Sequence, residues 1–346
     1  MGCSGRLDNC DGKRLKADMW MGRYVFWVVV TFLAFLDPAS AFELLQTKPI
    51  FQDMPGEAYE LGLSNIEKVT ESRFGVRTVL RKNGPDRAIV KRIAAEYRKS
   101  ERVVIDIEAW PLVPASMATG NTEKHLEWLE KTLSWWKEEN KDSKICVFGL
   151  PNNDAAWWAI FKSTRGDEGR VAEYWDFERH VAKRIFGLVD FLCPSGYWKR
   201  DTPEVNASAW RLMARVAHEI YRKPIIFFTW HRNPKGFSWL DPRTYRFSLE
   251  QFCLVADGII VWGHGDEKAR DVFDPKPKVR TLLGDRYRAP NGNLSTNRMM
   301  RDWEAHTRFD AAAGEYVSDK QLPKEAAWIS ELMAFLRTAH MRCPAN

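Results

Sequence analysis

The sequence of 346 residues lacks the signatures of several common kinds of site. It contains no Gly-x-Gly-x-x-Gly run and no Walker loop, so a nucleotide-binding fold is not favoured. No Cys-x-x-Cys spacing occurs, which argues against a structural zinc site. The formal net charge is only +6 and no long block of lysine or arginine is present, so nucleic-acid binding is not indicated. Neither an internal repeat nor an interdomain linker is found, and we therefore predict one folded domain.

A long hydrophobic run is also absent. The best candidate, residues 24–36, is about 13 residues long, which is too short to span a bilayer comfortably. It is followed by Ala39-Ser40-Ala41, a small-x-small cleavage pattern. These features predict a secretory signal peptide over residues 1–41, with an over-long polar start and cleavage near Ala41. We expect a secreted or periplasmic protein with no stable membrane span after cleavage, and an uncleaved signal anchor is the alternative.

Cysteine is scarce, and cleavage of the leader would leave four: Cys146, Cys193, Cys253 and Cys343. An even number of cysteines in an exported chain permits two disulfides, with three pairings open. Three of the four lie in apolar segments, so buried free thiols are an equally good interpretation.

Tryptophan, by contrast, is abundant, with 16 copies. Many of them will lie in the core, because tryptophan is bulky and mostly buried. The surplus still leaves room for a ligand-binding surface lined with aromatic rings.

Strands and helices alternate from about residue 85 onward. Helices are expected over residues 85–100, 121–140, 171–187, 203–222 and 248–255. Strands are expected over residues 102–108, 144–150, 188–193, 225–229 and 257–262. These strands are continuous apolar runs, which is typical of parallel strands covered on both faces.

The alternation favours a barrel or a doubly wound sheet, and the missing nucleotide-binding loops weaken the second. Weak strand candidates at residues 49–52, 59–63 and 77–81 bring the total to about seven or eight. We therefore predict an α/β fold, a TIM-like (β/α) barrel over residues 42–346. Within it, residues 264–320 are expected to form an irregular excursion, and residues 325–340 a closing helix.

The strand at residues 103–110 ends in two carboxylates and an aromatic ring. Asp106 and Glu108 point to the same side because side chains alternate along a strand. Three more apolar strands end in tryptophan, at Trp198, Trp230 and Trp262. Reactive side chains gather at the carboxyl ends of barrel strands. Paired acids beside flat rings suit acid catalysis on a sugar bond, so a carbohydrate ligand is indicated.

Four short segments resemble the hyaluronidase family. Residues 106–110 (Asp-Ile-Glu-Ala-Trp) look like its acidic strand motif, Asp-x-Glu-x-Trp. Residues 228–232 are similar to its apolar strand ending in aromatic-x-Arg, and residues 258–263 to its late strand ending in Trp-Gly. Tyr197 follows an apolar segment where the family places a substrate-binding tyrosine. The matches occur in the family's order, over about residues 103–263.

Two positions depart from the family's pattern. Pro111-Leu112 follows Trp110, where the family usually has Arg-Pro. Trp230 holds an aromatic slot that is commonly filled by tyrosine. The resemblance therefore implies a distant relative, and the polymer that it cuts can differ from the family's.

The resemblance implies substrate-assisted acid catalysis. Glu108 would be the general acid, and Asp106 would orient an N-acetyl group of the substrate. The acetamido oxygen would act as the nucleophile, an exception to the two-carboxylate scheme. Tyr197 would hydrogen-bond that acetamido group.

The remaining predicted site residues would bind the sugar rings. Trp230 and Trp262 would form apolar walls, Trp110 would also contact substrate, and Arg232 would bind a uronate or sulfate group. No cofactor and no metal are expected.

We expect an exported glycosidase that cleaves an amino-sugar-containing polysaccharide, of endo-N-acetylhexosaminidase type. A non-catalytic barrel that only binds carbohydrate is the alternative, because the arginine after Trp110 is missing. A third interpretation is a metal-dependent hydrolase on the same barrel. In the first two cases the partner is a polysaccharide or oligosaccharide, and the oligomeric state is left open.

Overall fold

The structure is a computed structural model in which the chain divides into two units, Met1–Ser40 and Ala41–Asn346. It describes residues 42–47, 61–74, 84–118, 121–199, 202–231, 240–262, 296–310, 315–319 and 324–343. The predicted leader and the weak strand candidates at 49–52 and 77–81 lie outside these residues.

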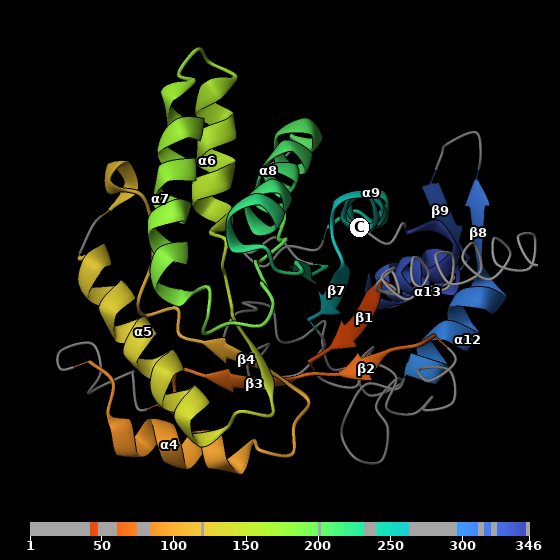
Figure 1. The fold of residues 1–346 in the computed structure, drawn as a ribbon. Coiled ribbons are helices and arrows are strands. Elements are labelled where there is room, and N and C mark those ends of the chain that lie inside the picture. Colours follow the sequence, from red (N-terminus) through yellow and green to blue (C-terminus); the bar gives the residue numbers. More distant parts are fainter. Residues whose placement is uncertain are drawn as a thin grey trace, which may run out of the picture. The chain divides into compact units, whose positions relative to one another are not determined.

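Parallel strands form the centre of the second unit (Figure 1). Their bounds are β1 (Glu43–Gln46), β2 (Ser64–Asn65), β3 (Glu67–Thr70), β4 (Arg102–Asp106), β5 (Lys144–Val147), β6 (Ile226–Thr229) and β7 (Gly258–Val261). The regular ladders form two sheets, in the orders β2-β1-β7-β6 and β3-β4-β5. Every pairing in these two sheets is parallel, as the continuous apolar runs predict.

Isolated bridges and one residue join the two sheets into a circuit. Residues 192–195 bridge to β5 through Phe148 and Cys193, and to β6 through Leu192 and Ile225. At the other junction only Ile66 separates β2 from β3, and its N–H donates to the carbonyl of Gln46 at 3.0 Å. The parallel pairing thus returns to its starting strand, which is the topology of the predicted (β/α) barrel.

Two strand predictions need correction. Residues 188–193 were expected to form a regular strand, but the structure has only isolated bridges there. The candidate at 59–63 is wrong where it is described, because residues 61–63 form a turn and coil, and the strand begins at Ser64. Polar residues in the segment Ser-Asn-Ile-Glu-Lys-Val-Thr hide its strand pattern from a search for apolar runs.

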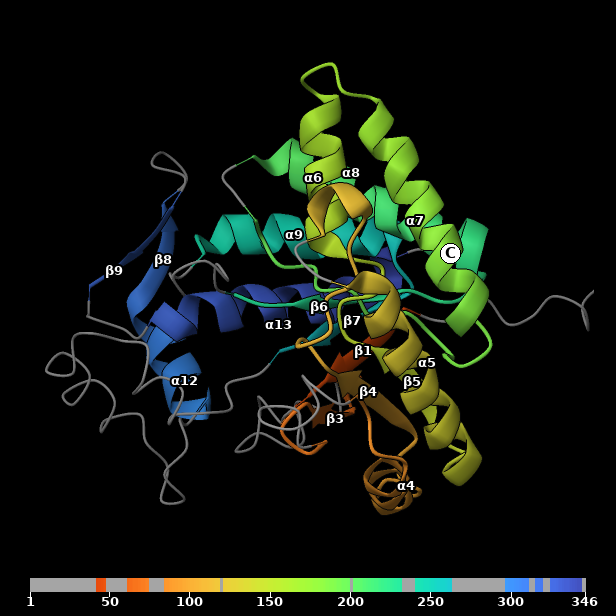
Figure 2. The same cartoon turned by 90° about the vertical axis from the view of Figure 1, so that its left-hand side faces the viewer.

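Helices follow most of the strands (Figures 1 and 2). Their bounds are α4 (Arg87–Glu96), α5 (Thr122–Glu139), α6 (Asn153–Ser163), α7 (Gly169–Ile185), α8 (Pro203–Val216) and α9 (Pro242–Val255). A short 3-10 turn, η2 (Ala115–Met117), precedes α5, and a π-helical segment, η3 (Ala217–Tyr221), extends α8. Helix α6 was not predicted. It packs between α7 and α8, so it does not show the apolar and polar faces by which a surface helix is recognised. Helix α9 begins earlier than expected because Asp241 caps it, accepting from the N–H of Arg243 at 2.9 Å.

The predicted irregular excursion over residues 264–320 is partly wrong. Its end contains helix α12 (Thr296–His306) and an antiparallel hairpin of β8 (Thr307–Asp310) and β9 (Glu315–Ser318). The polar composition of this stretch suggested loops, but a hairpin of two short strands tolerates such a composition. Helix α13 (Lys324–Arg342) confirms the expected closing helix and packs against α9 and α12.

Alternate side chains of the strands fill the barrel interior. The interior cluster contains Leu45, Ile66, Val104, Cys146, Phe191, Cys193, Ile226, Phe228 and Ile260. A larger cluster between strands and helices contains the residues of opposite parity, such as Val103 and Ile105.

Both pairs of cysteines form disulfides. Cys146 and Cys193 join within the interior cluster, and Cys253 and Cys343 tie α9 to the end of α13. This settles the pairing that the sequence left open. Within the described residues, no helix combines the length and apolar character needed to cross a bilayer.

A glutamate is fully buried among the helices. Glu178 of α7 accepts a hydrogen bond from the Tyr221 hydroxyl at 2.8 Å and one from the Asn152 N–H at 3.2 Å. Burial raises the pKa of Glu178 to about 7, and the hydrogen bonds oppose that rise only in part.

Stability is therefore expected to fall as the pH rises from 4.5 to about 7. In this window the folded state holds a proton that the unfolded chain has released, so the stabilisation present below pH 4.5 is lost. Relative to Glu178→Gln, the free energy of unfolding should drop by about 3 kcal/mol across it. Urea unfolding at several pH values measures this, with exposed Glu168→Gln as the control. Parallel pH curves for wild type and Glu178→Gln would contradict it.

Candidate active site

The two predicted acids lie together at the end of β4. Asp106 is the last residue of the strand and only 5% exposed, whereas Glu108, two residues on, is exposed to solvent. Although the residue as a whole is exposed, nearby protein atoms partly exclude water from its carboxyl group, and this raises the carboxyl pKa. Burial is the main cause, and the charge of Asp106 is the next. Glu108 thus combines a path to solvent with a raised pKa, which a general acid requires.

A lysine that sequence reasoning missed binds Asp106. Lys68 of β3 places its Nζ 2.7 Å from Asp106 Oδ2, and the side chains are 11% and 7% exposed. Burial nevertheless raises the pKa of Asp106, because it outweighs the lowering by Lys68. The other oxygen, Asp106 Oδ1, is buried and has no hydrogen-bond partner among the described residues.

Lys68 also contacts aromatic rings at the same end of the barrel. Its Nζ lies 3.5 Å from the centroid of the Trp262 ring and 5.1 Å from that of Phe148. Trp262 directly follows β7 and Phe148 directly follows β5, so both rings stand at strand ends like Asp106. The Lys68 ammonium therefore joins side chains from three strands.

A third carboxylate supports the turn after β4. Glu71, just after β3, accepts a hydrogen bond from the Ala109 N–H at 3.0 Å through its Oε2. Its charge helps to raise the pKa values of Asp106 and Glu108. Lys68 could have been found from the alternation Ile66, Lys68, Thr70, had the strand been recognised, whereas Glu71 follows the strand and lies outside this alternation.

Three predicted aromatic residues converge on the acids. Tyr197 is half-buried, and burial first, then the charges of Asp106 and Glu108, raises the pKa of its phenol. The Tyr197 ring lies 5.4 Å from the ring of half-buried Trp230 and 6.1 Å from that of Phe148. With Trp262 beside Lys68, the predicted Tyr197, Trp230 and Trp262 gather around the acid pair.

Trp110 and Trp198 do not join this group. Trp110 is 5% exposed and packs 5.5 Å from the ring of Trp128 on α5. Trp110 therefore packs in the core, and this packing does not support its predicted contact with substrate. The strand ends at Asp106 and a turn follows, with the Trp110 N–H donating to the Ile107 carbonyl at 3.4 Å, so the two-residue alternation does not reach Trp110. Trp198 is likewise core, with its ring 6.1 Å from that of Trp210.

The predicted Arg232 and the histidines that follow two strands, His231 and His264, are either core or outside the described residues. His231 is buried, and its ring stacks on that of Trp328 at 4.0 Å. Arg232 and His264 lie outside the described residues. Among the residues that the structure does describe, no group of three or more His, Cys, Asp or Glu side chains could hold a metal ion.

A second lysine flanks the acids. Lys199 Nζ lies 2.5 Å from Asp154 Oδ1, and its charge lowers the pKa of Glu108. The Lys199 N–H donates to the side chain of buried Asn206 at 3.1 Å. The acid pair therefore has one lysine bound to Asp106 and another within electrostatic range of Glu108.

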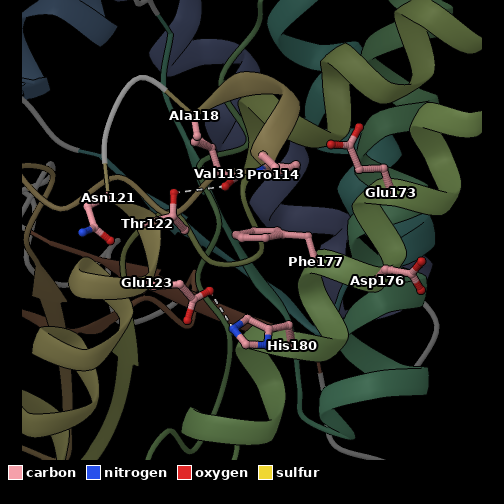
Figure 3. A pocket seen from close by; sticks show the side chains of 11 residues that line it. Val113, Pro114, Ala118, Asn121, Thr122, Glu123, Glu173, Asp176, Phe177 and His180 are labelled. Carbon is pink, nitrogen blue, oxygen red and sulfur yellow. Dashed lines mark hydrogen bonds and ion pairs between the residues drawn. The ribbon is translucent and has the colours of Figure 1, made fainter.

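A hollow of about 610 Å³ lies elsewhere, between residues 113–118, residues 121–123 and helix α7 (Figure 3). None of the acid-pair residues lines it. Its own acids are engaged: Glu123 pairs with His180 at 2.8 Å, and Glu173 accepts from Ser116 at 2.8 Å. The hollow is therefore separate from the acid pair at the strand ends.

Comparisons with known proteins find likeness in structure only. No family model and no curated protein matches the chain. Bee venom hyaluronidase is similar in structure at 15% identity and a TM-score of 0.44, covering 70% of this chain and 97% of that one.

Two further structures are a xylanase from Cellvibrio japonicus and an endoglucanase from an uncultured bacterium. The xylanase matches at 9% identity and a TM-score of 0.36, over 64% of this chain and 78% of its own. The endoglucanase matches at 10% identity and a TM-score of 0.34, over 87% and 85%. All three similarities are distant in sequence and partial in structure. The chemistry of the site is therefore argued from the side chains of this chain.

Proposed function

We propose that this protein is a glycoside hydrolase that cleaves an amino-sugar-containing polysaccharide by substrate-assisted acid catalysis. The observation that carries the proposal is the pair at the end of β4, a solvent-accessible Glu108 with raised pKa beside the nearly buried Asp106. Environments that give two carboxyls different roles are typical of acid–base catalysis on glycosides.

Glu108 is the general acid in this proposal. It protonates the glycosidic oxygen as the bond from that oxygen to the anomeric carbon breaks, and the bonding electron pair leaves with the oxygen. Its raised pKa keeps the carboxyl protonated at pH values where a glutamate with the ordinary pKa would be ionised.

Asp106 is suited to orient the substrate rather than to attack it. Its carboxylate is held by Lys68 and nearly buried, but Oδ1 has no partner among the described residues. In this proposal that oxygen is the acceptor for an acetamido N–H, and because Oδ1 is buried, the substrate must displace the side chains that cover it. The acetamido oxygen then bonds to the anomeric carbon, and water later opens the cyclic intermediate with Glu108 as the base.

The aromatic residues supply the walls for the sugar. Trp230 and Trp262 offer flat apolar faces, and Tyr197 has a hydroxyl that stays protonated because its pKa is raised. Arg232 remains a proposed ligand for a uronate or sulfate group. Bee venom hyaluronidase has been solved with a hyaluronic acid tetramer, so hyaluronan belongs among the polymers to test.

We also infer that the protein is exported. The sequence pattern of residues 1–41 favours a cleaved leader. Two disulfides, Cys146–Cys193 and Cys253–Cys343, support this inference because such bonds persist in oxidising compartments.

Glu108→Gln should lower hydrolysis by at least about 100-fold, because the variant has no proton to donate. Reducing-end release from a panel of glycosaminoglycans and chitin-like polymers measures this, with oligosaccharide binding expected to be retained. The control is Glu219→Gln, which removes an exposed glutamate paired with Arg215. No release from any polymer by the wild type would contradict the proposal and favour a carbohydrate-binding barrel. Activity abolished by EDTA would favour a metal-dependent hydrolase.

Hydrolysis should be fastest at acidic pH and be lost as the pH rises through the raised pKa of Glu108. In Asp106→Asn the residual activity should be lost at a lower pH, because the Asp106 charge no longer raises the pKa of Glu108. A pH–rate profile of kcat for both proteins tests this. Loss of activity at the same pH in both would show that the two carboxyls are not coupled.

A further inference from the structure

So far Lys68 has been described only as the partner of Asp106, although it contacts two parts of the site. Lys68 lies on β3, and its Nζ is 2.7 Å from Asp106 Oδ2 and 3.5 Å from the centroid of the Trp262 ring. Asp106 ends β4 and Trp262 follows β7. One cation therefore links the acid pair, at the end of β4, to an aromatic ring that follows β7 in the other sheet.

The acid pair needs its single proton on the accessible carboxyl. Two neighbouring carboxyl groups repel each other when both are ionised, so one proton tends to stay on the pair. The carboxyl that ionises more easily loses its proton first, and the other carboxyl keeps its own. Burial alone would place the proton on Asp106, because Asp106 is more buried than Glu108. That arrangement would leave Glu108 without the proton that it must donate.

We propose that Lys68 is a positioning residue that fixes the negative charge on Asp106, keeps the catalytic proton on Glu108, and braces the Trp262 ring. This inference rests on the proposed function. An ammonium 2.7 Å from one carboxylate oxygen favours the ionised form of that group. Burial raises the pKa of Asp106 overall, and Lys68 is the group that opposes this rise.

The other charged groups around the pair do not replace Lys68. Glu71 is negative and raises the pKa values of both carboxyls. Lys199 acts on Glu108, where it favours loss of the proton, and Asp154 partly neutralises it at 2.5 Å. Tyr197 is neutral, since its pKa is raised. Within the described residues, Lys68 is the cation in contact with Asp106.

The first test does not depend on turnover. Carboxyl ¹³C NMR of protein labelled at aspartate and glutamate follows both titrations, with Asp106→Asn and Glu108→Gln assigning the signals. In Lys68→Met the Asp106 titration should move up by at least about one pH unit. The indole signal of Trp262 should also shift. Lys68→Arg should stay near the wild type, because it keeps the charge.

The matched control is Lys137→Met. Lys137 also binds a carboxylate, Asp190 Oδ2, at 2.6 Å, and that carboxylate also accepts from the Ile145 N–H at the start of β5. Its loss should leave the Asp106 titration unchanged. If Asp106 titrates at the wild-type pH in Lys68→Met and the Trp262 signal does not move, the proposal is overturned.

Folding failure would also be decisive. If Lys68→Met does not fold but the double variant Lys68→Met/Asp106→Asn does, Lys68 is needed to hold the Asp106 charge, as proposed. If neither folds, Lys68 has a structural role in the barrel and the proposal is overturned.

The second test uses the polymer that the wild type cleaves. Lys68→Met should lower kcat by roughly 100-fold with little change in KM, and Lys68→Arg should restore most of it. An unchanged kcat in Lys68→Met would overturn the proposal. If the wild type cleaves nothing, the proposed function fails, whereas the NMR titration still decides the charge state of Asp106.

Discussion

The ion pair between Lys68 and Asp106 makes a charged carboxylate tolerable at a nearly buried strand end. Removing an ion from water costs on the order of several kcal/mol, which an opposite charge at hydrogen-bond distance offsets only in good geometry. At 2.7 Å the ammonium offsets this cost on one oxygen and leaves the other buried without a partner among the described residues. Burial is the main cause of the raised pKa of Glu108, and the charge of Asp106 raises that pKa further.

The barrel circuit brings these groups together from distant parts of the sequence. Side chains of one parity fill the interior up to the Cys146–Cys193 disulfide, and the next residues of the same parity emerge at the strand ends. Asp106, Phe148, Trp230 and Trp262 each stand two residues beyond an interior residue: Val104, Cys146, Phe228 and Ile260. The circuit of parallel strands thus turns a two-residue repeat along each strand into a ring of side chains at one end of the barrel.

This repeat explains how much of the site the sequence could predict. The strands before Asp106, Glu108, Tyr197, Trp230 and Trp262 are recognisable apolar runs, so the sequence could predict that these residues follow strand ends. Trp110 fits the same count, but the turn after Asp106 interrupts the strand and sends the ring into the core beside Trp128. A count along the sequence cannot register that interruption.

Lys68 and Glu71 were missed for the opposite reason. Their strand carries polar side chains on both faces, because one face contacts the charged site and the other is partly exposed. Apolar runs identify strands inside a core and fail where a strand lines a polar site. The same limit applies to β1, whose four residues follow the predicted leader without a distinct pattern of their own. Helix α6 was missed because it is apolar around most of its circumference.

The claim that the acids and aromatic residues share one saccharide groove can be tested directly by NMR. Oligosaccharides containing N-acetylhexosamine would be titrated into Glu108→Gln while the indole N–H signals of the tryptophans are recorded. The account predicts shifts at Trp230 and Trp262 and none at buried Trp110 and Trp198. Shifts confined to Trp110 and Trp128, or no shift at any concentration of sugar, would contradict it.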